Sequence, residues 1–104
     1  FSRQATIDDY NFDGFDDISF SIPDAGMGVY RTFTVFLFDP ETKKFRLLKE
    51  PDFSKSKCSC FCDLKLNKAK KTISSECRGG ARWWKDNYRY KNGNLIWMSS
   101  EKAD

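Results

Sequence analysis

The chain has 104 residues, a length that fits one domain (residues 1–104) with a single hydrophobic core. It contains ten phenylalanines but no histidine, which excludes Ser-His-Asp and Cys-His nucleophiles, imidazole acid–base catalysis and histidine-ligated zinc. The longest apolar run, residues 35–38, is far shorter than the ~20 residues of a membrane-spanning helix, so we expect a soluble protein. The net charge of +3 is uneven, because residues 1–24 hold six aspartates and one arginine. This asymmetry predicts an acidic cation site near the N-terminus and a basic surface elsewhere.

Apolar residues recur at every second position in short runs separated by Gly, Pro, Asn, Asp and Lys, a pattern typical of strands and turns. The predicted strands cover residues 18–22, 30–38, 44–48, 60–66, 71–77, 82–90 and 95–98, with an eighth near 5–7. Pro40 fits a type I turn, and Asn92-Gly93 favours a primed hairpin turn. We predict an all-β fold, a seven- to eight-stranded antiparallel meander forming a sandwich or a strongly curved sheet, with alternating phenylalanines in the core.

Residues 9–17 read D-x-N-x-D-G-x-x-D, the most specific chemical signal in the chain. Calcium prefers about six to eight oxygen ligands, and side chains at alternate positions of a tight loop converge on one point. The predicted ligands are the side chains of Asp9, Asn11, Asp13 and Asp17 and the backbone carbonyl of Phe15. An EF-hand is excluded, because the twelfth loop position is Phe20 rather than Glu and the flanking segments are predicted strands. The alternative is an Asx-rich turn whose carboxylates cap backbone N–H groups.

A glycine-rich segment, residues 25–30, connects two predicted strands. It lacks the lysine and the following helix of a phosphate-binding loop. An exposed loop on a rigid sheet is a common place for recognition residues, so Gly28 and Tyr30 are candidate partner contacts. Alternatively, residues 25–30 only connect the two predicted strands and bind no partner.

Four cysteines in a small chain predict an oxidising compartment. If the turn at residues 67–71 is centred between Ala69 and Lys70, Cys62 faces Cys77, and we predict a Cys62–Cys77 disulfide. Cys58 and Cys60 then either pair otherwise or stay reduced. A four-thiolate zinc site is less favoured because the paired C-x₂₋₄-C spacing is missing, and a catalytic thiol has no histidine to activate it.

Residues 78–90 mix cations with large rings. Alternation along a strand places two sets of side chains on opposite faces: Trp84, Asp86, Tyr88 and Tyr90 on one, and Trp83, Lys85, Asn87 and Arg89 on the other. The first set can enter the core while the second forms a solvated surface. Alternatively the exposed set contacts a protein, a carbohydrate or single-stranded nucleic acid, the last being least favoured at a net charge of +3. The candidate contacts are Arg82, Trp83, Lys85 and Arg89.

The order of these features resembles a family of small bacterial periplasmic or lipoprotein β-proteins. That family includes a calcium-binding immunity protein against a secreted lysozyme-like effector, and its fold is similar to that of periplasmic inhibitors of invertebrate-type lysozyme. The resemblance extends from Asp9 to Leu95 and rests on the acidic loop, the loop ending at Tyr30, the hairpin at 38–45, Arg78-Gly79-Gly80, and residues 88–90 with 94–95.

The resemblance implies an eight-stranded β-fold, calcium bound by the loop residues named above, no catalysis, and insertion of a loop into the cleft of a glycan hydrolase. The inhibitory element of the related lysozyme inhibitors is similar to S-G-x-Y. The nearest stretch here is residues 27–30, in which Met27 replaces the serine and removes a hydrogen bond to a catalytic carboxylate.

We therefore predict a non-enzymatic, calcium-binding protein that is periplasmic, secreted or lipid-anchored at the bacterial cell surface. Its predicted partner is a lysozyme-like peptidoglycan hydrolase, which it inhibits. The alternative is a glycan-binding or cell-surface module in which Trp83 or Trp84 stacks on sugars. An enzyme with a carboxylate pair is less favoured, because the acidic residues outside the loop show no convincing pairing. We expect neither a nucleic-acid partner nor a transmembrane segment.

Overall fold

A computed structural model of the protein describes residues 3–24, 30–79 and 81–103. These residues form strands and loops without any helix. The strands are β1 (Gln4–Asp8), β2 (Asp17–Pro23), β3 (Arg31–Asp39), β4 (Lys44–Leu47), β5 (Lys65–Asn67), β6 (Thr72–Gly79), β7 (Arg82–Lys91) and β8 (Asn94–Lys102). The predicted all-β class is thus confirmed, with eight strands.

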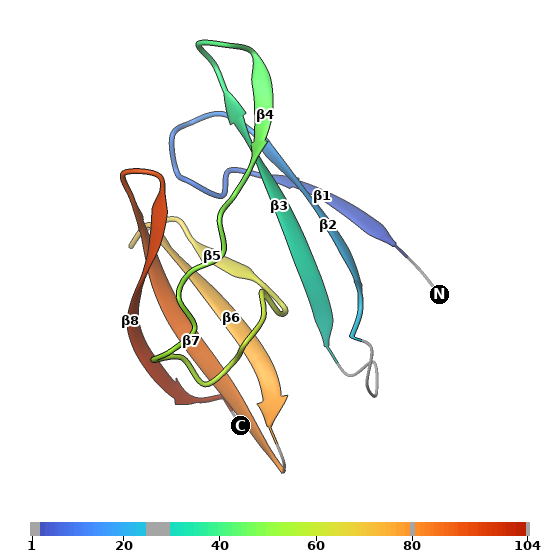
Figure 1. Cartoon of the computed structure of the whole chain (residues 1–104), viewed down its shortest axis with the longest axis vertical. Helices are drawn as coiled ribbons and strands as arrows, with labels where there is room; N and C mark the ends of the chain where they lie inside the picture. The colour runs from blue at the N-terminus through green and yellow to red at the C-terminus, as the bar shows by residue number, and fades with distance from the viewer. Residues whose placement is uncertain (1–2, 25–29, 80, 104) are drawn as a thin grey trace.

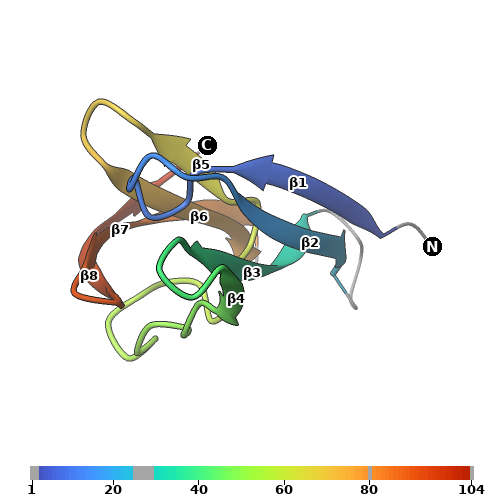
Figure 2. The same ribbon diagram turned by 90° about the horizontal axis from the view of Figure 1, so that it is seen from above.

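The strands make two four-stranded antiparallel sheets, in the orders β1-β2-β3-β4 and β5-β6-β7-β8. Each strand pairs with the strand that precedes or follows it in sequence, which is the predicted meander (Figure 1). The second view shows the sheets as two layers, with the segment between β4 and β5 running along one side of them (Figure 2). We call these layers the N-terminal sheet and the C-terminal sheet.

Local turn chemistry sets the hairpins. Asn92 and Gly93 both have positive φ, 52° and 83°, as a type I′ turn between β7 and β8 requires. The β3–β4 hairpin pairs Phe38 with Phe45, and the Lys43 N–H donates to the Asp39 carbonyl at 2.7 Å. These two predicted hairpins are confirmed.

The main core lies between the sheets. It contains eight buried apolar side chains: Tyr10, Val35, Leu37, Leu48, Phe61, Ile73, Tyr88 and Leu95. From β7, Asp86 and Tyr88 are buried, and Tyr90 packs against this core, so the predicted inward face of that strand is confirmed. Burial of these side chains supplies the main driving force that holds the two layers together.

The prediction that the phenylalanines build the core is wrong for most of them. Phe61 is the phenylalanine buried in the main core, with Phe12 and Phe33 packed at its margin. In β2 the inward positions are instead Asp17, Ser19 and Ser21, each at most 2% exposed. The Ser19 and Tyr10 hydroxyls share a 2.7 Å hydrogen bond there. Because both faces of β3 carry apolar side chains, alternation alone does not identify the face that meets the core.

The segment between β4 and β5 connects the two sheets through backbone hydrogen bonds. The Phe33 N–H donates to the Phe61 carbonyl at 2.8 Å, and the Asp63 N–H donates to the Arg31 carbonyl at 2.9 Å. On the other side, the Glu76 N–H of β6 donates to the Cys62 carbonyl at 2.8 Å. Residues 61–63 therefore bridge β3 and β6, and we call them the bridging segment.

Asp86 anchors the chain just before the bridging segment. Its carboxylate is fully buried and accepts hydrogen bonds from the Lys57 and Cys58 N–H groups, both at 2.9 Å, and from the Ser100 hydroxyl. Hydrogen bonds to a buried charged group contribute more than neutral ones, and a buried donor without a partner is costly.

Asp86→Ala is therefore expected to lower the free energy of unfolding by roughly 3 kcal/mol or more, because it leaves two backbone N–H groups without their acceptor. Urea unfolding of the oxidised protein, followed by tryptophan fluorescence, measures this change. The control is Asn87→Ala, which removes only an exposed hydrogen bond to Ser99. Equal losses in the two variants would contradict the anchoring role of Asp86.

Candidate functional site

The acidic loop, residues 9–17, connects β1 to β2. The Asp9 carboxylate accepts hydrogen bonds from the N–H groups of Asp13 at 3.2 Å and Gly14 at 2.8 Å. The Asp13 carboxylate accepts one from the Phe15 N–H at 3.0 Å. Gly14 has a φ of +91°, which is the bend expected of glycine at this position. These are the capping contacts of an Asx-rich turn, and a carboxylate oxygen that accepts one N–H retains a further lone pair for a cation.

Asp17 closes the loop against the neighbouring strand. Its side chain is 1% exposed and accepts hydrogen bonds from the N–H groups of Tyr10 and Phe38, both at 2.8 Å. Burial raises the pKa of this carboxyl, the two N–H donors oppose that rise, and the charges of Asp13 and Asp9 add to it. A cation among these carboxylates would relieve the repulsion.

Asn11 carries an independent sign of a missing partner. Its Oδ1 atom is buried and has no hydrogen-bond donor. Buried oxygens almost always have a partner, and an amide oxygen is a ligand that calcium accepts. Across residues 3–24, 30–79 and 81–103, however, no three Asp, Glu, Cys or His side chains converge as a metal-ligand group. The loop thus offers oxygen donors of the right kind, and calcium binding stays a prediction.

At the opposite end of the molecule, the structure brings together three of the predicted partner contacts. The rings of Tyr30 and Trp83 meet edge to face, with centroids 6.3 Å apart and planes at 79°. Arg82 begins β7 next to Trp83, and Arg78 is the cross-strand partner of Trp83; both arginines are exposed. We call these four residues the aromatic–arginine end. It lies where β3 begins and where β6 passes into β7 (Figure 1).

The other predicted contacts do not join this group. Gly28 lies outside the described residues. Lys85 and Arg89 are on the outward face of β7, where Lys85 is 3.8 Å from Glu101 and Arg89 is about 20 Å along the strand from Trp83. Trp84 points inward, with the Lys57 Nζ over its ring at 5.1 Å.

The cysteines form a small second core beneath the aromatic–arginine end. Cys58, Cys62 and Cys77 are buried, and Tyr30, Cys60 and Trp84 pack against them. At the base of the β2–β3 connection, the Asp24 N–H donates to the Tyr30 carbonyl at 2.9 Å. Tyr30 and Trp84 are therefore held on a covalently cross-linked support, which limits the conformational freedom of this end.

The predicted Cys62–Cys77 disulfide is wrong, because the structure pairs Cys58 with Cys77 and Cys60 with Cys62. The predicted register itself holds at Leu66 and Ile73. The ladder ends at Lys65, however, and Asp63 has a φ of 39°, so the chain turns away before it reaches Cys62. The Cys62 backbone still lies beside β6, while its side chain meets Cys60 instead of Cys77.

A thiol count distinguishes the two pairings. Cys60→Ser/Cys62→Ser keeps Cys58 and Cys77, and we expect it to fold with no free thiol under denaturing conditions. Cys58→Ser/Cys60→Ser keeps Cys62 and Cys77, and we expect two free thiols together with a loss of stability of about 3 kcal/mol. Titration with a thiol reagent and mass spectrometry measure both. A fully oxidised second variant as stable as the wild type would contradict the structural pairing.

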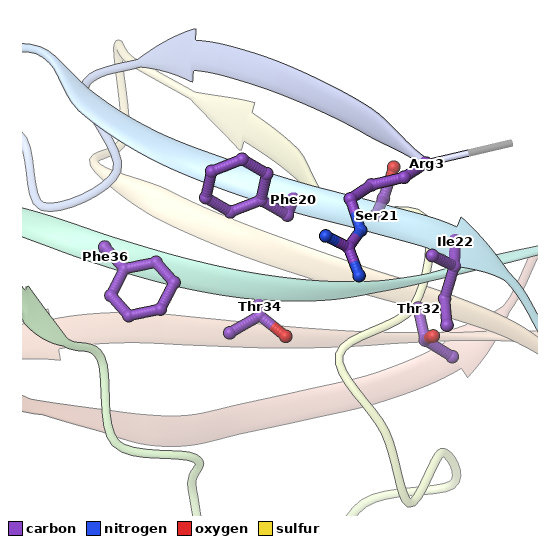
Figure 3. Close-up of a pocket in the computed structure, with 7 residues that line it drawn as sticks. All are labelled: Arg3, Phe20, Ser21, Ile22, Thr32, Thr34 and Phe36. Carbon is purple, nitrogen blue, oxygen red and sulfur yellow. The ribbon is translucent and has the colours of Figure 1, made fainter.

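A further surface, on the outward face of the N-terminal sheet, was not predicted from the sequence. Phe20 and Phe36 lie there with ring centroids 6.1 Å apart, and they line a groove of about 390 Å³ together with Arg3 (Figure 3). The sequence signal that could have identified this face is the alternation in β2. Ser19 and Ser21 take the inward positions there, which leaves Ile18, Phe20 and Ile22 facing outward.

Comparison with protein-family models, curated proteins and solved structures finds no match for this chain. Within the described ranges there is also no membrane-spanning helix.

Proposed function

We propose that this protein is a non-catalytic, extracytoplasmic binding protein that inhibits a lysozyme-like peptidoglycan hydrolase through its aromatic–arginine end. The observation that carries the proposal is the edge-to-face contact of Tyr30 and Trp83, with exposed Arg78 across the ladder from Trp83 and exposed Arg82 next to it in sequence. Tyrosine, tryptophan and arginine are the residues most enriched among the contacts that dominate protein interfaces.

The charge at this end is complementary to such a target. Lysozyme-like hydrolases cleave glycans with a pair of carboxyl groups, so their clefts are acidic. Arg78 and Arg82 are exposed on either side of the β6–β7 turn and can pair with those groups, while the rings of Tyr30 and Trp83 supply apolar contact area. The disulfide-linked support fixes this arrangement before binding, which lowers the entropy cost of association.

The cysteines also support the proposed location. All four are oxidised, and disulfides persist in the periplasm and outside the cell. A periplasmic, secreted or lipid-anchored protein would meet peptidoglycan hydrolases there.

We expect Tyr30→Ala and Trp83→Ala each to weaken inhibition at least tenfold, because each removes a large ring from the centre of the proposed contact. The measurement is the turbidity decrease of peptidoglycan suspensions treated with c-type, g-type and invertebrate-type lysozymes, titrated with the full chain. Phe45→Ala, which removes an exposed ring near the β3–β4 turn at the opposite end of the molecule, is the matched control and should inhibit like the wild type. Absence of inhibition toward every hydrolase at a several-fold molar excess would refute the proposal.

A glycan-binding module is the second candidate, and a specific feature favours it. Trp97 and Ile96 line a hollow of about 250 Å³ together with Asp52, Ser54 and Lys55, a combination of a ring and polar groups that suits a sugar. Trp84 is covered by Lys57 and is a poor platform, so this hollow and Trp83 are the remaining stacking sites. Quenching of tryptophan fluorescence by peptidoglycan fragments, without any hydrolase present, would favour this function.

We further propose that the acidic loop binds calcium in a stabilising role. The support is the oxygen-rich composition of the loop, the buried and unpartnered Asn11 Oδ1, and the raised pKa of Asp17. The candidate ligands remain Asp9, Asn11, Asp13, Asp17 and the Phe15 carbonyl. Calcium would supply positive charge that offsets the repulsion among the carboxylates.

Addition of calcium at about 100 times its dissociation constant should raise the melting temperature by roughly 10 °C, because binding to the folded state alone adds about 2.7 kcal/mol. A chelator should reverse the rise, and differential scanning calorimetry measures it. Asp13→Ala should abolish the shift. Asp16→Ala, the adjacent exposed aspartate outside the predicted ligand set, should preserve it, and an identical response of the two variants would contradict the ligand assignment.

A further inference from the structure

The outward face of the N-terminal sheet carries continuous rows of apolar side chains. The longest row crosses all four strands, because Ile7 pairs with Ile18, Ile18 with Phe36, and Phe36 with Leu47. On one side of it lies the Phe38–Phe45 pair, with ring centroids 5.3 Å apart, and Phe15 packs against Phe38 at 6.2 Å. On the other side lie Phe20 and Ile22. We call this surface the apolar face.

The apolar face is exposed over an area that suits an interface. Ile7, Phe15, Phe45 and Leu47 are 46–68% exposed. The four strands have 5, 7, 9 and 4 residues, and at about 3.3 Å per residue and about 4.8 Å between strands they span roughly 400 Å² in projection. That area lies within the ~300–600 Å² of the largest apolar patch on a typical monomer, where such patches often serve a function. Two such faces together cover roughly 800 Å² in projection, which approaches the ~1,000 Å² of total buried area at which specific interfaces begin.

Charge is confined to the two ends of the face. Among the described outward positions of this sheet, Arg3 is the charged one, and it lies beside Ile22 and Thr32 in the groove (Figure 3). The opposite end, formed by the acidic loop and the β3–β4 turn, carries more acidic than basic residues: Asp13, Asp16, Asp39 and Glu41 against Lys43 and Lys44. The face therefore has a basic end and an acidic end.

We infer that the apolar face pairs with the apolar face of a second copy of this chain. A two-fold axis that lies in the interface, perpendicular to the strands, makes the strands of the two copies run in opposite directions. In that arrangement Arg3 of each copy lies over the acidic end of its partner, and the apolar rows pack against each other as two sheets do in a sandwich. The alternative axis, parallel to the strands, would place the two Arg3 side chains at the same end.

Sedimentation equilibrium of the full oxidised chain tests the pairing. We expect a dimer to predominate at about 50 µM, and Leu47→Glu to raise the dimer dissociation constant at least about 100-fold, because it buries a charge in the apolar contact. Ile7→Lys, at the other end of the same row, should act alike and provides a second test if Leu47→Glu does not fold. Ile96→Glu is the matched control: Ile96 is 46% exposed on the C-terminal sheet, and its replacement should leave the dimer intact.

Charge reversal tests the orientation. Arg3→Glu should weaken the dimer about tenfold, and Asp16→Arg combined with it should restore most of the affinity. Failure of the double variant to recover would overturn the antiparallel arrangement. A monomer at about 200 µM would overturn the pairing altogether. In that case, binding of the monomer to lipid vesicles or to another protein, lost in Leu47→Glu, would assign the face to a different occupant.

Discussion

The bridging segment holds the two halves of the molecule in one arrangement. The hydrogen-bonded ladders of the two sheets are separate, since one ends at β4 and the other begins at β5. The bridging segment, residues 61–63, connects the two ladders because it hydrogen-bonds to β3 on one side and to β6 on the other. Backbone groups of a buried segment need partners, so these bonds fix both the path of the segment and the distance between the strands.

Two further contacts keep the bridging segment in place. The disulfide between Cys58 and Cys77 ties the chain to the end of β6, and the Asp86 carboxylate holds the Lys57 and Cys58 N–H groups against β7. The disulfide belongs to the second core against which Tyr30 and Trp84 pack, and Asp86 lies two residues along β7 from Trp84. The same contacts thus support the proposed binding residues and connect the two sheets. A substitution that disturbs the connection should therefore also disturb the support.

Most strands and the two hairpins could be predicted from the sequence because their signals are local; the exception is the predicted strand at residues 60–66, where β5 covers only Lys65–Asn67. Asn92-Gly93 specifies its turn through backbone conformation, and the alternation around Asp86 and Tyr88 has one apolar-rich side. The disulfides and the apolar face could not be predicted. Cys62 leaves the ladder through a positive φ at Asp63, which residue spacing does not reveal. Phe20 and Phe36 point outward because Ser19, Val35 and Leu37 fill the inward positions, which only the packing of both sheets determines.

The neighbour-to-neighbour pairing of all eight strands has a consequence for how the protein folds. Loops between paired strands are short, so each hairpin can close with a small loss of chain entropy. The contacts that join the sheets close much longer loops, since Arg31 and Asp63 are separated by 32 residues, and their closure costs more chain entropy than that of a hairpin. The Cys58–Cys77 disulfide likewise joins two segments that are 19 residues apart in sequence, and it can form only after those segments have come together.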